Sequence, residues 1–181
     1  MRNNRNDDHN MKLQVLIQPK IGLDAEMRHS VVEVLNNTLA NEAVLSLKTR
    51  NAHWNVSGAG FLELRILYKT QYKQLNAITD EIAGRTRTLG GLPIGSFEGF
   101  LKNSRLTERH GDIPNIRDLL ADHETSIRFL VENAKKCSEE YTDKVTSDFL
   151  VSIQYLHERM AGILRAHIEP QLTGDESNQG K

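Results

Sequence analysis

The stretch KTRNAHWNVSGAGFLELRILYKTQYKQLNAITDEIAGRTRTLGG, residues Lys48–Gly91, decides the fold. Its first residues continue a helical pattern, which the Gly-rich segment NVSGAG at 55–60 interrupts. A second long helix is predicted from Phe61 to Leu89, where Gly90-Gly91 ends it. The stretch therefore predicts two long helices joined by a short turn.

Helical patterns also lie on both sides of this stretch. Asp24 is a plausible N-cap for the first helix. Its inward positions recur at helical spacing and are Val31, Val34, Leu35, Thr38, Leu39, Glu42, Leu45 and Leu47. A third helix is predicted to begin near Pro114, since proline suits a first turn, and to end near Glu140. Thr142 or Asp143 is predicted to cap a fourth helix.

The fourth helix should end before Pro170, and a short helix capped by Ser96 is predicted within GSFEGFLKNS, between the second and third helices. Four long helices with one long crossover predict an all-α, ferritin-like four-helix bundle. We expect the bundle at residues 21–170. Residues 1–20 are predicted to form a flexible arm, partly helical around Asp7–Ile17, and 171–181 a disordered tail.

Composition narrows the function classes. The 181 residues are 26% charged and 38% hydrophobic, as in globular proteins. The net charge of −1 argues against a surface that grips nucleic acid all round. The lone Cys137 cannot form an internal disulfide, which favours a reducing compartment. No membrane span or signal peptide is predicted, so the expected location is the cytoplasm.

Three motifs in this order resemble the Dps family, the DNA-binding and iron-oxidising mini-ferritins. They are NAHWNVSG, FLELRILYKTQY and TDEIAGRTRTLGG. The resemblance is sharp across Ala52–Gly91 and extends in layout over roughly residues 25–168. It implies a shell of twelve copies, association with DNA, iron storage and a role in stress protection.

In that family, the ferroxidase site lies between two subunits: one gives two His and an Asp, and the partner gives an Asp and a Glu. His53 matches the first His, and Asp80 matches the partner's Asp. The other three ligand positions hold Arg65, Lys69 and Gly84. The resemblance therefore implies an iron site that has lost three of its five ligands.

These changes fall on one surface, since positions 65, 69, 80 and 84 lie within roughly 100° of one another around a helix. Neither a guanidinium nor an ammonium group can coordinate a metal, and both repel Fe(II). We therefore expect little or no ferroxidase activity and no catalytic residue. His53 and Asp80 would remain from the family's iron site and would bind iron weakly, so no cofactor other than weakly bound or stored iron is expected. The pattern predicts instead that Arg65 or Lys69 pairs with Asp80 of a neighbouring copy.

Other candidate ligands have plainer interpretations. Glu26 and His29 have Glu-x-x-His spacing, but it occurs once, where a di-iron bundle uses two copies. The run Asp122–Glu124, which includes His123, is more typical of a solvated helix face than of a pore or metal site. His157 and His167 are interpreted as core or surface histidines. Trp54 is interpreted as core packing, although it adjoins the iron site in the family.

Binding to DNA would rest on the N-terminal arm. The arm has four basic residues against two acidic ones, Asp7 and Asp8, a net charge of 4 − 2 = +2. The basic residues are Arg2, Arg5, Lys12 and Lys20. One such arm binds weakly, but many copies on a shell act together. Contacts to phosphates would be independent of sequence and sensitive to salt.

The leading hypothesis from the sequence is a homo-dodecameric shell that protects DNA. An alternative is an iron-storage ferroxidase that uses relocated ligands or the acidic interior of the shell. A third reading is a structural shell with neither role, its arms solvated.

Overall fold

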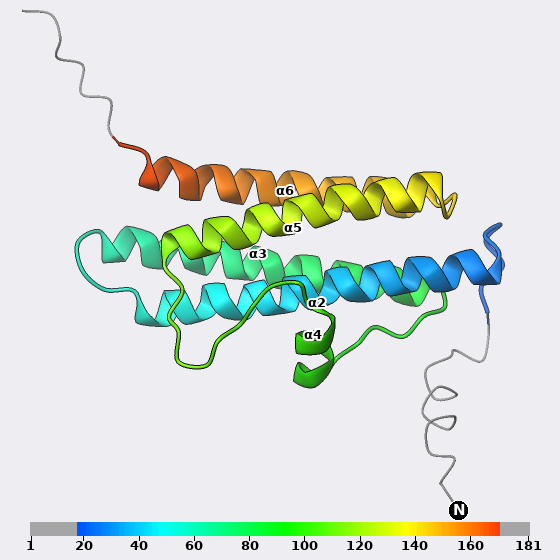
Figure 1. Ribbon diagram of the computed structural model, residues 1–181, viewed down its shortest axis with the longest axis horizontal. Helices are drawn as coiled ribbons and strands as arrows, with labels where there is room; N and C mark the ends of the chain where they lie inside the picture. Colours follow the sequence, from blue (N-terminus) through cyan, green and yellow to red (C-terminus); the bar gives the residue numbers. More distant parts are fainter. Residues whose placement is uncertain (1–17, 171–181) are drawn as a thin grey trace, which may run out of the picture.

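The computed structural model describes residues 18–170, and the expected helix at 7–17 and the tail at 171–181 lie outside this range. The described residues contain five helices and no strand, which confirms the all-α prediction. The helices are α2 (Ala25–Asn55), α3 (Phe61–Thr88), α4 (Phe97–Asn103), α5 (Ile116–Glu139) and α6 (Lys144–Ile168) (Figure 1).

Side-chain caps fix where most helices begin. The Asp24 carboxylate accepts from Met27 N at 2.9 Å and starts α2, as predicted. Ser96 caps α4, and Asp143, one of the two predicted alternatives, caps α6. Each cap satisfies a backbone N–H that has no partner within the helix.

The third long helix, α5, begins near Pro114 as predicted, but the proline does not lie in its first turn. The helix is capped by Asn115, whose side chain accepts from Asp118 N at 3.2 Å, while the Asp118 carboxylate accepts from Asn115 N at 2.9 Å. This reciprocal capping box starts the helix at Ile116 and leaves Pro114 outside the first turn.

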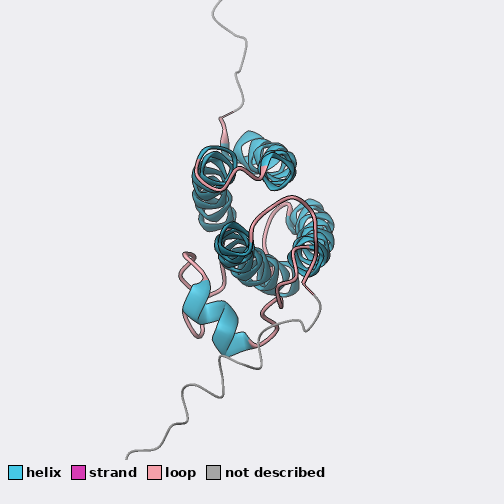
Figure 2. Cartoon of the chain, turned by 90° about the vertical axis from the view of Figure 1, so that its right-hand side faces the viewer, coloured by secondary structure: helices cyan, strands magenta, loops and turns pink. Residues whose placement is uncertain are grey.

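The four long helices form two hairpins, α2 with α3 and α5 with α6 (Figure 2). The connection from α3 to α5 crosses the bundle and carries α4, which packs against α2. Asn41 of α2 accepts from Arg105 N at 2.7 Å, and Lys48 Nζ donates to the Thr107 carbonyl at 2.8 Å. These bonds hold the connection along α2.

The core lies between the hairpins and is mostly aliphatic. Its largest fully buried side chains are Leu35, Leu39, Leu45, Leu75, Ile78, Ile82, Leu89, Leu119, Leu130, Leu150, Ile153 and Leu164. Leu47 was predicted inside, but its side chain is 44% exposed. Gly91 is required where α3 ends, because a Cβ there would lie 2.5 Å from Val32 Cγ1.

A partly buried ion pair joins α3 to the start of α6. Arg85 Nη2 lies 3.0 Å from Asp143 Oδ2, and the side chains are 17% and 5% exposed. Arg85 Nε also donates to Thr146 Oγ1 at 2.9 Å. Asp143 therefore serves two purposes: it caps α6 and ties the second hairpin to the first.

Cys137 is buried at the end of α5, beside this ion pair. Its side chain is 0% exposed, and its carbonyl accepts from Asp143 N at 2.8 Å. Burial, with a smaller contribution from the Asp143 charge, raises the pKa of the thiol to about 12. The thiol is therefore a packing group at neutral pH.

Candidate functional site

His53 lies near the C-terminal end of α2, and its side chain faces α3. Its Nδ1 lies 2.9 Å from the Arg65 carbonyl oxygen. A carbonyl can only accept, so Nδ1 carries the hydrogen, and in the neutral ring Nε2 then keeps its lone pair. Metal-binding histidines are commonly oriented in this way, but the same bond also anchors the start of α3. The residue is 8% exposed, and its ring centroid lies 5.5 Å from that of Tyr72.

The other four family positions lie on the exposed side of α3. Arg65, Lys69, Asp80 and Gly84 are all exposed. Within residues 18–170, none of the three charged residues forms an ion pair. Their charges are therefore available to a second molecule.

One chain cannot bring the two halves of this site together. Arg65 and Asp80 are 80 − 65 = 15 residues apart on α3, or about 22 Å at ~1.5 Å per residue. His53 is hydrogen bonded to the Arg65 end. Asp80 of the same chain is therefore out of reach, and only a second copy could place an Asp80 beside His53.

Four large apolar residues at the end of α2 and the start of α3 are exposed. Trp54 is 60% exposed, which overturns its interpretation as core packing, and Phe61, Leu62 and Ile66 are 45%, 55% and 60% exposed. Exposed apolar clusters beside charged groups are typical of protein–protein contact surfaces.

Gly84 lies in open space on the same helix. A Cβ added there would meet nothing within 4 Å, and its φ is that of an ordinary helical residue. The position therefore accepts a side chain without a clash inside the chain.

The remaining candidate ligands do not gather into a metal site. His29 lies 3.4 Å from Glu33, and both side chains are largely exposed. Asp122 pairs with Lys48 at 2.6 Å, whereas Glu124 pairs with Arg165 at 2.8 Å. Throughout residues 18–170, no group of three or more His, Cys, Asp or Glu side chains is placed to hold a metal.

Three of the histidines differ sharply in exposure. His123 was predicted on a solvated face, but it is 0% exposed and lies in the core. This prediction failed because neighbouring residues of a helix point in different directions. His157 is also fully buried, as one of its two interpretations allowed, whereas His167 is exposed.

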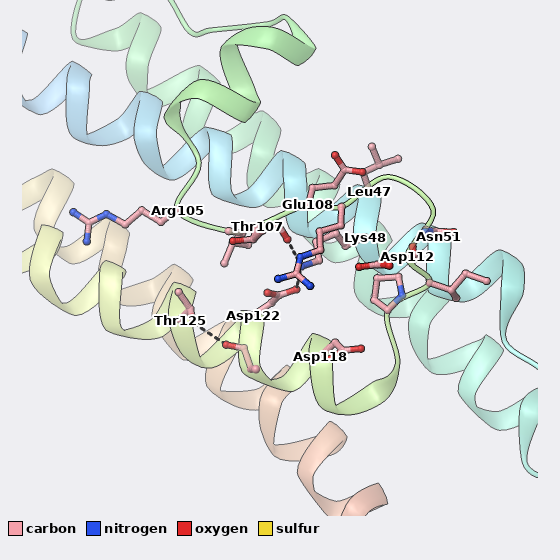
Figure 3. Close-up of a pocket in the computed structure, with 15 residues that line it drawn as sticks. Leu47, Lys48, Asn51, Arg105, Thr107, Glu108, Asp112, Asp118, Asp122 and Thr125 are labelled. Atoms are coloured by element: carbon pink, nitrogen blue, oxygen red, sulfur yellow. Dashed lines mark hydrogen bonds and ion pairs between the residues drawn. The ribbon is translucent and has the colours of Figure 1, made fainter.

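A pocket of about 510 Å³ lies between α2, the connection and α5 (Figure 3). Lys48 and Asp122 form their ion pair inside it, with side chains 13% and 15% exposed. Burial raises the pKa of Asp122, and the neighbouring Lys48 partly offsets this effect. The pairing neutralises both charges. Lys48 also donates to the connection between α3 and α5, so we interpret the pocket as the place where this connection is held against α2 and α5.

Of the four predicted DNA contacts, only Lys20 falls within the described residues, and it is exposed. Arg2, Arg5 and Lys12 lie outside that range. No helix between residues 18 and 170 has the length and apolar character needed to cross a membrane.

Comparison with known proteins places these features in a family. The sequence matches the ferritin-like domain family over residues 32–170. It is 42% identical over 155 residues to an uncharacterised low temperature-induced protein of Nostoc sp., covering 83% of this chain and 87% of the relative. It is 32% identical over 147 residues to DNA protection during starvation protein 2 of Bacillus anthracis, covering 78% of this chain and 99% of the relative.

The fold leads to the same family. The crystal structure of the Dps protein from Vibrio cholerae superposes with a TM-score of 0.78 at 28% identity, covering 86% of this chain and 99% of that chain. That protein is described as a member of a broad superfamily of ferritin-like diiron-carboxylate proteins. The chain therefore belongs to the DNA protection during starvation (Dps) family of ferritin-like proteins.

Proposed function

We propose that this protein forms a dodecameric, Dps-like shell in the cytoplasm that binds and protects DNA without sequence preference. We further propose that its iron-oxidising centre between subunits is largely lost. The observation that carries the second proposal is the exposed face of α3, where cations occupy two ligand positions and glycine a third. The first is supported by relatives that are named for DNA protection during starvation.

The charge on this face disfavours iron. Arg65 and Lys69 are one helical turn apart and are not neutralised by an ion pair within residues 18–170. Two like charges repel a divalent cation, and neither side chain offers a lone pair to replace the lost ligands. His53 and Asp80 alone would bind iron weakly.

The N-terminal arms are the proposed DNA contact. Deleting residues 2–20 should weaken binding by more than about tenfold at low salt, because phosphate contacts carry most of the non-specific affinity. The measurement is a gel-shift or anisotropy titration over a series of salt concentrations. The full-length shell should lose affinity steeply with salt, and the truncated one should retain a shallower slope.

A control deletion of residues 172–181 removes a polar segment with a net charge of 1 − 2 = −1 from the other end and should not weaken binding. Assembly of each shell is checked by size. If the shell lacking residues 2–20 bound DNA as well as the full-length shell, the arm would be excluded as the contact.

The exposed cations of α3 are proposed to hold two copies together by pairing with Asp80 of the neighbour. Asp80→Lys should then weaken association strongly, and Arg65→Ala should weaken it to a lesser extent. Combining Asp80→Lys with Lys69→Asp reverses both charges of one pair and should recover much of the assembly, as coupling across a contact requires. Native mass spectrometry or sedimentation velocity measures the species present.

Glu81→Lys provides the control, since it makes the same charge change at the next exposed residue of α3. It should disturb assembly less than Asp80→Lys. Equal effects at the two positions, or no recovery in the Asp80→Lys, Lys69→Asp double variant, would argue that these charges are merely solvated.

A second candidate function is an iron-storage ferroxidase with relocated ligands. The observation in its favour is His53, whose Nδ1 is engaged by a carbonyl so that Nε2 is available to a metal. The iron-oxidation measurement described in the Discussion separates the two functions.

A further inference from the structure

Two histidines and a glutamate form a hydrogen-bonded chain across the middle of the core. His157 Nε2 lies 3.1 Å from Glu42 Oε2, and His157 Nδ1 lies 3.0 Å from His123 Nδ1. Glu42 is 1% exposed, and both histidines are 0% exposed. Because the three residues belong to α2, α6 and α5, the chain joins the two hairpins and also links the helices of the second hairpin.

Such a chain is an unusual choice for a helical core. Aliphatic side chains of similar size would fill the same space without the desolvation of a carboxylate and two imidazoles. Packing alone therefore does not explain why these residues are ionisable. A role in binding and releasing protons would explain it.

The hydrogen bonds limit how many protons the chain can hold. The Glu42 carboxylate accepts, so His157 Nε2 carries a hydrogen. The contact between the two Nδ1 atoms can hold only one hydrogen, since one nitrogen must accept. His123 Nε2 is buried and has no hydrogen-bond partner among residues 18–170. When both rings are fully protonated, two N–H groups face each other and the bond is lost.

Little in the surroundings can compensate a positive charge on His123. Helix α2 contributes Glu42 to the hydrogen-bonded chain, and this carboxylate already pairs with His157. From α3, the core receives the neutral amide of Gln71, bonded to the Met160 carbonyl of α6, and the phenol of Tyr68. On α5, the Asp122 carboxylate is engaged by Lys48.

We propose that Glu42, His157 and His123 form a proton-sensitive clasp, which acidification opens at the contact between His123 and His157. Opening separates α5 from α6 and loosens the second hairpin, so the bundle responds to acid from its core. This device depends on neither iron nor DNA.

The direction of the pH dependence follows from the burial of His123. Burial, reinforced by the nearby His157, lowers the pKa of His123 well below its ordinary value of 6.5. The unfolded chain therefore binds more protons than the folded chain at acidic pH. The contribution of a neutral His123 to the free energy of unfolding is fully present above about pH 6.5. It is lost as the pH falls toward the lowered pKa.

The test compares the complete protein with His123→Asn. The asparagine Nδ2 replaces the Nδ1 donor toward His157 but cannot be protonated. Below about pH 6.5, the unfolding constant of the unmodified protein should rise more steeply than that of the variant. The difference should approach tenfold per pH unit near pH 5, where the unfolded chain binds about one more proton than the folded chain. Chemical unfolding, followed by near-UV circular dichroism at each pH, measures both.

His29→Asn is the matched control, because it removes the same kind of titratable group from an exposed position outside the core. Its pH profile should match that of the unmodified protein. Parallel profiles for His123→Asn and the unmodified protein would overturn the proposal.

A second measurement needs no variant. NMR can follow the ring resonances of the histidines in the folded protein as the pH is lowered. One ring should keep the chemical shift of a neutral imidazole until the structure is lost in acid. If every ring titrated near pH 6.5 while the fold remained intact, the clasp would be excluded.

Discussion

Fast, saturable Fe(II) oxidation is the expected result when Arg65→His, Lys69→Asp and Gly84→Glu are combined in one chain. The three changes return imidazole and carboxylate ligands to the face of α3 and remove two charges that repel iron. Gly84 has open space for the new side chain, and replacing a helical glycine also favours the helix. The original protein should oxidise iron no faster than buffer, and the triple variant should exceed it by more than about tenfold.

The measurement is Fe(II) oxidation in air and with hydrogen peroxide, followed by absorbance. Adding His53→Ala to the triple variant should remove most of the gained activity if His53 is the remaining histidine ligand of the proposed site, since its Nδ1 is engaged by the Arg65 carbonyl and only Nε2 is left for a metal. A matched triple variant with alanine at positions 65, 69 and 84 removes the cations without adding ligands and should remain inactive.

The opposite outcome is equally informative. If the original protein oxidised iron rapidly with saturation, its metal ligands would lie elsewhere and the iron-storage function would replace the proposed one.

Asp143→Ala should cost more stability than the loss of an ordinary surface charge. The change leaves Arg85 without its partner in a half-buried position, and breaking a buried ion pair costs about 3–5 kcal/mol. The exposure of Arg85 places the expected loss toward the lower end of that range. The lost cap of α6 contributes about 1 kcal/mol more. Urea unfolding followed by circular dichroism measures the free energy of unfolding.

Asp148→Ala is the control for this prediction. Asp148 pairs with Lys144 one turn further along α6, but both side chains are largely exposed. Its loss should stay within about 0.5 kcal/mol, as for most exposed pairs. Similar losses for the two variants would show that the Arg85–Asp143 pair contributes no more than a solvated one.

The helices could be predicted from sequence because their signals are local. Asp24, Ser96 and Asp143 are capping residues placed just before helical patterns, and each caps a helix in the structure. Pro114 marked the start of α5 to within two residues, but the capping box of Asn115 and Asp118 places the proline before the first turn rather than in it.

The surroundings of the site were harder to predict, because apolar side chains serve both cores and contact surfaces. Trp54 has the sequence features of a core residue, yet it is 60% exposed beside the family's iron-site positions. Periodicity shows which side of a helix is apolar, but it does not show whether the apolar side meets the same chain or another one.

The buried proton chain was missed for a different reason. Glu42 occupies a position of the inward pattern on α2, which is itself a signal, because a carboxylate inside a core requires a partner. That partner, His157, lies 157 − 42 = 115 residues further along the chain. Only the folded structure, in which a side chain of α6 reaches one of α2 across the core, shows that the two residues meet.

The burial of Cys137 affects how its thiol reacts with oxidants such as hydrogen peroxide. Oxidants attack the thiolate rather than the thiol, and with a pKa of about 12 almost no thiolate exists at neutral pH. Since Cys137 is the only cysteine in the sequence, disulfides between copies of the chain and oxidation of the thiol to sulfenic acid are both disfavoured. Burial and the raised pKa of the thiol therefore protect Cys137 from oxidation.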